Sequence, residues 1–217
     1  MDPRRYFTTD QLAAVAAAAR AAEGRSGGEI VPYVVGRCDD YPEAGWLGGL
    51  VGAIGAAGLI AAWPVATGSW LPHAALLEAL APVAGAILGY AAAAVPAVRR
   101  RLVAPETLDR RVRLRAEAAF LEEGVFNTQD RTGVLILLAL FEHRAVVLAD
   151  AGIHARVQPG EWDALVAHLT AGARAGRPAA ALVEAIETCG AILARQAVPL
   201  RSDDSDELPD AVRLREQ

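Results

Sequence analysis

The sequence predicts a small layered α/β domain that is interrupted by a two-helix transmembrane hairpin. One observation is that residues 44–98 hold a single acidic residue, Glu78, and no Lys or Arg. The other is that the flanking segments are charged and contain both amphipathic helical patterns and short runs of β-branched residues. Neither flank alone has enough strands for a sheet, so we expect residues 1–43 and 99–200 to fold together around the insertion.

Composition agrees with a chain of two parts. Hydrophobic residues make up 53% of the 217 residues and charged residues 22%, so apolar and charged residues must be segregated along the chain. The formal net charge of -5 argues against a dedicated nucleic-acid-binding protein. Every basic residue is Arg, so no lysine is present to form a Schiff base or a phosphate-binding loop. Cys38 and Cys189 have no metal-binding spacing and are expected to be reduced thiols.

The uncharged segment should form two helices, at about 46–63 and 74–98, because Pro64, Gly68 and Pro72 separate its halves. At 1.5 Å per residue these helices are about 27 Å and about 37 Å long, against a hydrocarbon core of about 30 Å. The alternative is a buried helix pair in a soluble core. Soluble helices of this length normally carry a charged face, which these lack.

Small residues recur at GxxxG spacing in both helices: Gly48 and Gly52 in the first, Gly85 and Gly89 in the second. Such residues allow two helix backbones to approach closely, so we expect these four glycines to pack the hairpin. The same spacing is compatible with the dimerisation of two copies. Glu78 is expected to be an interfacial carboxylate rather than part of an ion pathway.

Charge and aromatic residues indicate an orientation. Trp46, Trp63 and Trp70 fall near the predicted membrane interfaces. Arg99, Arg100 and Arg101 follow the second helix, whereas the loop between the helices has no Lys or Arg. By the positive-inside rule the loop is external, which predicts a multi-pass protein of the plasma membrane with both termini cytoplasmic. No cleavable signal peptide is expected, because the N-terminal arginines are not followed by an apolar core.

The arginines after the hairpin also indicate a partner. Arg99, Arg100 and Arg101, together with the basic stretch 110–115, should attract anionic lipid headgroups of the bilayer. Nucleic acid is the competing partner, and the acidic remainder of the chain makes it less favourable. Another membrane protein or a second copy of the chain is a further possible partner.

The flanks supply the elements of the soluble domain. Thr8 and Gln11 form a capping box for a helix that should stop by Gly24, and residues 29–35 read as a strand. The remaining elements are expected as helices at 105–123, 161–173 and 179–196 and as strands at 132–140 and 145–149. Residues 201–217 are expected to form a disordered acidic tail.

One short motif suggests a serine hydrolase, since residues 24–28 read G-x-S-x-G around Ser26. In hydrolases that serine lies on a turn from strand to helix, which exposes its hydroxyl. Here a helix precedes the motif and a strand follows it. We therefore interpret these glycines as the stop of a helix and expect no catalytic residue at Ser26.

Several segments, taken in order, resemble the TPM domain family. They are Phe7-Thr8, residues 26–31, Ala118-Ala119-Phe120 with Gly124-Val125, residues 130–137, residues 149–153, and Trp162, Leu182, Ala185, Ile186 and Gly190. The resemblance covers residues 7–200 without the hairpin. It implies an α/β/α sandwich often tied to membranes, and, for some members, divalent-metal binding and phosphatase activity. The inserted hairpin is similar to the bacterial membrane-protein branch of that family.

Three carboxylates could meet at one edge of such a sheet. If the first two strands are parallel and the third antiparallel, Glu29, Asp130 and Asp150 gather there and could hold a cation such as Ca²⁺. The alternative is that they cap turns and pair with Arg131. A second acidic group, at residues 39–43, reads as a solvated linker.

Two functions from different classes follow from these observations. The favoured one is a membrane-anchored, non-catalytic accessory or interaction module at the cytoplasmic face. The alternative is a divalent-metal-dependent phosphatase on the same scaffold. A transporter role is disfavoured, because two helices with one peripheral carboxylate offer no pathway within a single chain.

Overall fold

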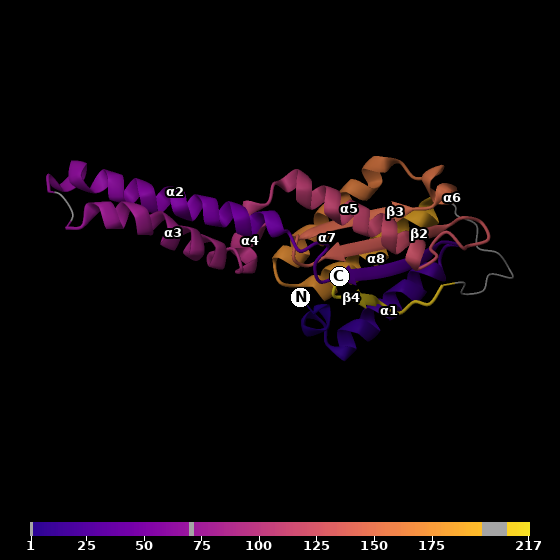
Figure 1. Cartoon of the computed structure of the whole chain (residues 1–217). Coiled ribbons are helices and arrows are strands. Elements are labelled where there is room, and N and C mark those ends of the chain that lie inside the picture. Colours follow the sequence, from indigo (N-terminus) through magenta and orange to yellow (C-terminus); the bar gives the residue numbers. More distant parts are fainter. Residues whose placement is uncertain (1, 70–71, 197–207) are drawn as a thin grey trace. The chain divides into compact units, whose positions relative to one another are not determined.

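The computed structural model describes residues 2–69, 72–196 and 208–217, and the chain divides into two compact units (Figure 1). The first unit combines residues 1–39 with residues 109–217, and the second consists of residues 40–108.

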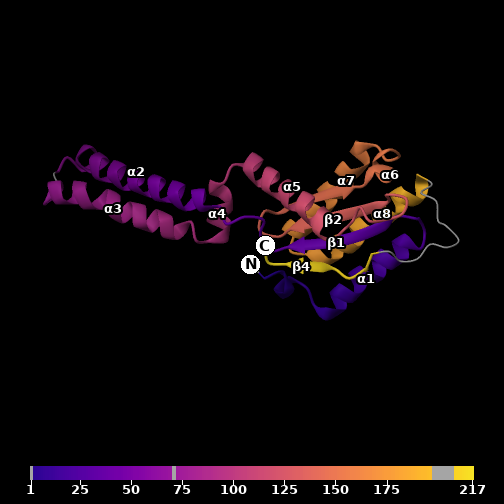
Figure 2. The same cartoon turned by 45° about the vertical axis from the view of Figure 1, so that its right-hand side comes forward.

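The first unit contains a four-stranded mixed sheet, in agreement with the predicted α/β class. Its strand order is β3-β2-β1-β4, where β1 is Glu29–Val35, β2 is Gly133–Ala139, β3 is Arg144–Ala149 and β4 is Arg213–Arg215. β1 lies between β2 and β4 and is parallel to both, whereas β3 is antiparallel to β2 (Figure 2). Every residue of β1 and β2 is buried, as expected for continuous apolar runs at the centre of a sheet.

Helices cover both faces of this sheet. One face carries Ile30, Val34 and Ile136 and packs against α1 (Thr9–Glu23), α7 (Pro159–Arg174) and α8 (Pro178–Arg195). The other face carries the alternate residues, including Val31, Tyr33 and Leu137, and packs against Val112, Ala116 and Ala119 of α5 (Pro105–Glu122). This alternation follows from the two-residue period of a strand and creates two apolar cores. Two short elements, η1 (Pro3–Tyr6) and α6 (Ala151–His154), complete the unit.

The sequence located these elements closely. The helices α5, α7 and α8 and the strands β2 and β3 begin and end within two residues of the predicted bounds. The capping box is present at the start of α1: Gln11 N–H donates to Thr8 Oγ1 at 3.2 Å, and Thr8 N–H donates to Gln11 Oε1 at 2.9 Å. These contacts satisfy two backbone donors that the first helical turn cannot pair internally.

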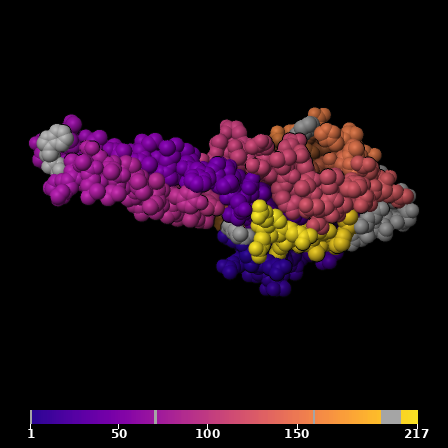
Figure 3. Space-filling view, viewed as in Figure 1, coloured from indigo at the N-terminus to yellow at the C-terminus, as the bar shows by residue number. Residues whose placement is uncertain are grey.

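The prediction of a disordered tail over 201–217 is wrong for its C-terminal part. Residues 201–207 lie outside the described residues, but Arg213–Arg215 forms β4 beside β1. Glu123 explains why so polar a segment is held, because it accepts hydrogen bonds from Arg213 Nε at 3.2 Å and from Arg215 Nη2 at 3.1 Å. In the space-filling view this yellow segment lies on the surface next to the indigo N-terminal segment (Figure 3).

The second unit is a helical hairpin of α2 (Pro42–Thr67) and α3 (Ala74–Ala92), followed by the short helix α4 (Pro96–Leu102). The predicted end of the second long helix at Val98 is wrong. Val95 is extended, with φ -72° and ψ 124°, because the residue before a proline disfavours the helical conformation, and Pro96 then begins α4. Conversely, α2 continues through Pro64 to Thr67, further than predicted. At 1.5 Å per residue α2 is about 39 Å long and α3 about 28 Å long.

Candidate functional site

The glycines of the hairpin lie where its two helices touch. A Cβ atom added to Gly48 would lie 2.6 Å from the carbonyl oxygen of Gly89. A Cβ on Gly52 or on Gly85 would overlap the carbonyl oxygen of the other residue. The structure thus brings Gly48 to Gly89 and Gly52 to Gly85, at a separation that no larger residue permits.

The large side chains of the same helices point away from the contact. Val65 is 88% exposed, Leu59 75% and Leu88 70%. Other exposed apolar residues of the hairpin include Leu50, Val51, Ile54, Leu80, Val83 and Ile87. The hairpin thus has small residues at the contact between its helices and large apolar residues on its outer surface. A water-soluble helix pair has the reverse arrangement. Both α2 and α3 are long and apolar enough to cross a membrane.

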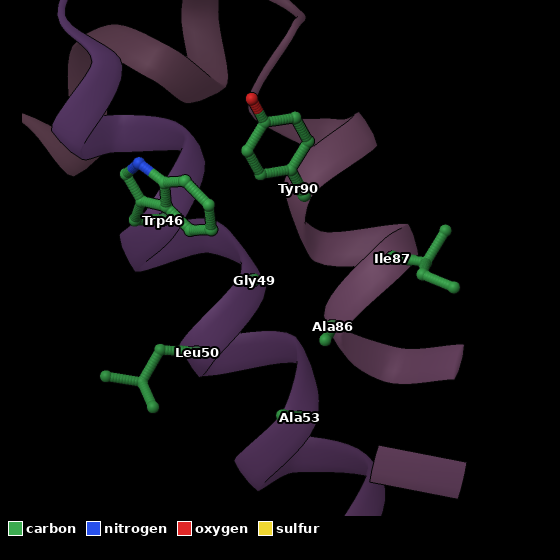
Figure 4. Close-up of a pocket in the computed structure, with 7 residues that line it drawn as sticks. All are labelled: Trp46, Gly49, Leu50, Ala53, Ala86, Ile87 and Tyr90. Atoms are coloured by element: carbon green, nitrogen blue, oxygen red, sulfur yellow. The ribbon is translucent and has the colours of Figure 1, made fainter. Parts of the chain in front are cut away.

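An apolar groove of about 420 Å³ runs along one side of the hairpin (Figure 4). Gly49, Ala53 and Ala86 line it, and Trp46 and Tyr90 lie together at one end with ring centroids 5.8 Å apart in an edge-to-face arrangement. Trp63 lies towards the other end of α2 and is 45% exposed, whereas Trp70 lies outside the described residues.

Of the three arginines predicted to contact lipid, Arg99 has a structural role within the hairpin unit. Its Nε donates to the carbonyl oxygen of Ala93 at 3.0 Å, and its Nη1 donates to that of Asp40 at 3.3 Å. A cation beside the C-terminal end of α3 also offsets the helix dipole. Arg100 is half-buried and Arg101 is exposed.

The basic stretch of α5 is largely engaged in ion pairs, which the sequence did not reveal. Arg111 Nε lies 2.8 Å from Asp39 Oδ2, so part of the predicted acidic linker is bound by an arginine. Arg113 pairs with Glu117 at 3.0 Å, and Arg115 pairs with Glu122 at 3.0 Å and contacts the hydroxyl of Tyr33. Three of the four arginines of this stretch therefore have acidic partners within the chain.

The three predicted metal ligands lie at the same end of the sheet, where β1 and β2 begin and β3 ends. Glu29 begins β1 in register with Gly133, Asp130 precedes β2, and the Asp150 N–H after β3 donates to the carbonyl oxygen of Gly133 at 2.9 Å. Among the described residues, however, no group of three or more His, Cys, Asp or Glu side chains is arranged to hold a metal ion. The three carboxylates share an end of the sheet without forming such a group.

Asp150 follows the alternative prediction, in which it caps a turn and pairs with Arg131. Arg131 Nε lies 2.5 Å from Asp150 Oδ2, and Arg131 Nη2 lies 2.8 Å from Oδ1. The same carboxylate caps α6 by accepting from Ala151 N–H at 2.7 Å. Burial acts to raise the pKa of Asp150, but the hydrogen bonds from Arg131 and Ala151 outweigh it and hold the pKa below its usual range.

Ser26 is not available as a nucleophile. It lies between the end of α1 and the start of β1, which confirms the expected order of helix, turn and strand. Its side chain is 2% exposed, and its hydroxyl donates to the carbonyl oxygen of Ala22 at 3.3 Å.

The sequence did not reveal a carboxyl pair formed by half-buried Glu23 and buried Asp210. Glu23 Oε1 accepts from Ile30 N–H at 2.8 Å, and Glu23 also bonds to Asp210, which is 8% exposed. Burial, with the adjoining Asp210 and Glu29, raises the pKa of Glu23 to about 8, so its carboxyl is protonated at neutral pH and joins the C-terminal segment to α1. Only the unusual position of an acid directly before the helix-ending Gly24 could have drawn attention to it.

These observations define a class of protein: an α/β domain that carries two candidate membrane-spanning helices. No protein-family model and no curated protein sequence matches the chain. Among solved structures, it is similar to the NMR structure of BA42 protein from the psychrophilic bacterium Bizionia argentinensis, with a TM-score of 0.57 and 21% sequence identity over 95% of this chain and 94% of that chain. At this identity the likeness concerns the fold alone.

Proposed function

We propose that this protein is a membrane-anchored, non-catalytic accessory or interaction module whose α/β domain is TPM-like. The observation that carries the proposal is the packing of the hairpin, with glycines at the helix contact and large apolar side chains on the outside. Such a surface needs an apolar solvent, and lipid supplies it while the helices satisfy their own backbone hydrogen bonds.

The TPM-like assignment of the soluble domain is supported by two features. The segments that resemble that family fall in β1, α5, β2, β3, α6, α7 and α8 or in the turns beside them, and at the start of α1. The sheet also has helices on both faces, as an α/β/α sandwich requires.

We place the protein in the plasma membrane with both termini in the cytoplasm. Support comes from the arginines of α4, which follow α3 directly, and from the lack of Lys and Arg in the connection between α2 and α3. Exposed Arg101 is the best placed of these arginines to contact anionic lipid headgroups.

A role without catalysis is supported by how the candidate reactive groups are used. The Asp150 carboxylate is engaged by Arg131 and by the cap of α6, and the Ser26 hydroxyl is buried against its own helix. A metal-dependent phosphatase would need Asp150 to leave both contacts before it could serve as a metal ligand.

The orientation is tested by cysteine labelling of intact cells. Ser69→Cys, in a chain that carries Cys38→Ser, should react with a membrane-impermeant maleimide, and Gln217→Cys in the same background should react only after lysis. The reverse pattern would contradict the proposed topology. Buried Cys189 provides the unlabelled background.

The absence of catalysis is tested with the full chain in detergent and p-nitrophenyl phosphate as the probe, with Mg²⁺ or Ca²⁺ added. We expect the same hydrolysis from the wild-type chain and from Asp150→Asn. Metal-dependent turnover that Asp150→Asn abolishes in a folded protein would replace the accessory role by the phosphatase.

A further inference from the structure

The edge strand β3 presents backbone groups that the described part of the chain does not pair. The Asp150 N–H bonds to the carbonyl oxygen of Gly133, and the antiparallel register pairs Val134 with Ala149. Since inward and outward groups alternate along such a ladder, the backbone groups of Ala145, Val147 and Ala149 point away from β2. Within residues 2–69, 72–196 and 208–217, none of these outward groups has a hydrogen-bond partner.

This edge also lacks the features that normally protect one. Natural edge strands are short or carry charges, prolines or bulges that prevent pairing with another chain. β4, at the opposite edge, has three residues and reads Arg-Leu-Arg. After Arg144, β3 reads Ala-Val-Val-Leu-Ala, with no charge, proline or glycine. A strand of this kind is expected to have a partner.

Two hollows between α5 and β3 border this edge. One is lined by Asp109 and Arg113 beside Ala145, and the other by Glu117 and Leu121 beside Ala149. These four α5 residues are spaced four apart and therefore form one stripe along the helix. From Ala145 towards Ala149 the stripe is therefore acidic, basic, acidic and apolar, in the order Asp109, Arg113, Glu117, Leu121.

We propose that the β3 edge is an interface between two copies of this chain, related by a two-fold axis through Val147. Antiparallel pairing about that axis places Ala145 opposite the second copy's Ala149, so that the outward groups of both strands are satisfied. The two four-stranded sheets become one continuous sheet. The interface is isologous, so each contact occurs twice.

Charge complementarity identifies a second copy as the occupant. The two-fold axis reverses the order of the α5 stripe in the second copy. Arg113 therefore lies opposite the second copy's Glu117, and Glu117 lies opposite the second copy's Arg113. The intrachain pair Arg113–Glu117, at 3.0 Å and mostly exposed, thereby becomes part of a four-residue network of alternating charge. Arg113 lines a hollow with Ala145 and Glu117 lines one with Ala149, so both side chains lie on the β3 side of α5, towards the proposed interface.

Mixing two charge variants of the full-length chain in detergent tests the pairing. Arg113→Glu alone and Glu117→Arg alone each place like charges across the interface and should weaken dimerisation, measured by sedimentation, about tenfold. In a mixture, the Glu pair of one variant faces the Arg pair of the other, so a heterodimer should form with near wild-type affinity. An intrachain role for these residues would give no recovery on mixing.

A second variant acts on the backbone. Val147→Pro removes an N–H that points outward and leaves the β2–β3 ladder intact, so it should abolish dimerisation while the far-UV circular dichroism stays unchanged. If this variant does not fold, the charge mixture decides. Three results would overturn the proposal. The chain could be monomeric under all conditions, the hairpin could hold a dimer that none of these variants weakens, or the β3 edge could bind only an extended peptide.

Discussion

Gly52 and Gly85 face each other in the hairpin so closely that a Cβ on either would overlap the other's carbonyl oxygen. Gly55, one turn further along α2, has nothing within 4 Å of the equivalent position. Gly52 and Gly55 therefore form a matched pair for testing the helix contact, because both lie in α2 and only Gly52 touches α3.

Gly52→Leu should separate α2 from α3 and destabilise the hairpin by about 1–3 kcal/mol or more, the usual cost of overpacking. Gly55→Leu should have almost no effect. Thermal unfolding of the full chain in detergent distinguishes the two variants. Equal stability of both would show that the helices do not meet at Gly52.

Asp150 supplies the second prediction, since it binds Arg131 and also caps α6. Asp150→Ala removes both contacts and should lower the free energy of unfolding by about 1–2 kcal/mol, the size of a lost cap, because the ion pair adds little where Arg131 is 56% exposed. Asp150→Asn keeps an acceptor for the Ala151 N–H and should cost less. Urea unfolding in detergent measures both, and an Asn variant less stable than the Ala variant would contradict this role.

Glu23 gives a pH-dependent stability. Burial raises the folded-state pKa of Glu23 to about 8 from its ordinary value of 4.5, so the folded state holds a proton that the unfolded state releases. The resulting stability is present in full below about pH 4.5 and is lost as pH rises towards about 8. Melting temperature should therefore fall with pH across this window.

Glu23→Gln is the control for that pH dependence. The amide still accepts from Ile30 N–H and donates towards Asp210, but it does not titrate. Its melting temperature should depend less on pH than that of the wild-type chain. Identical slopes for the two proteins would exclude Glu23 as the cause.

Glu123 gives the fourth prediction, because it holds both arginines of β4. Glu123→Ala should release this segment and speed trypsin cleavage after Arg213 and Arg215 by about tenfold, a change that corresponds to about 1.4 kcal/mol in the opening equilibrium. Glu187→Ala, at an exposed position on α8, serves as the control. Cleavage at the same rate in both variants would mean that the strand pairing alone holds β4.

Sequence patterns located the elements whose signals are local. The buried runs of β1 and β2, the capping box at Thr8 and the uncharged hairpin are each visible within a short window. The end of α3 was misjudged because the uncharged segment continues past Pro96, and apolar composition outweighed the backbone restriction that this proline imposes.

Contacts between distant residues were not predictable in the same way. β4 is three residues long in a polar tail and exists because of β1 and Glu123. The pairing of Glu23 with Asp210 joins opposite ends of the chain and requires the fold to be known. For Glu29, Asp130 and Asp150, the predicted strand order left a metal site and pairing with Arg131 both open, and only the structure shows that Arg131 holds Asp150.

Membrane insertion of the hairpin is the central claim, and alkaline carbonate extraction of membranes from cells that produce the full chain tests it most directly. The exposed apolar side chains of α2 and α3 predict that the protein stays in the membrane pellet and leaves it only with detergent. A folded monomer in the aqueous fraction, obtained without detergent, would contradict the account.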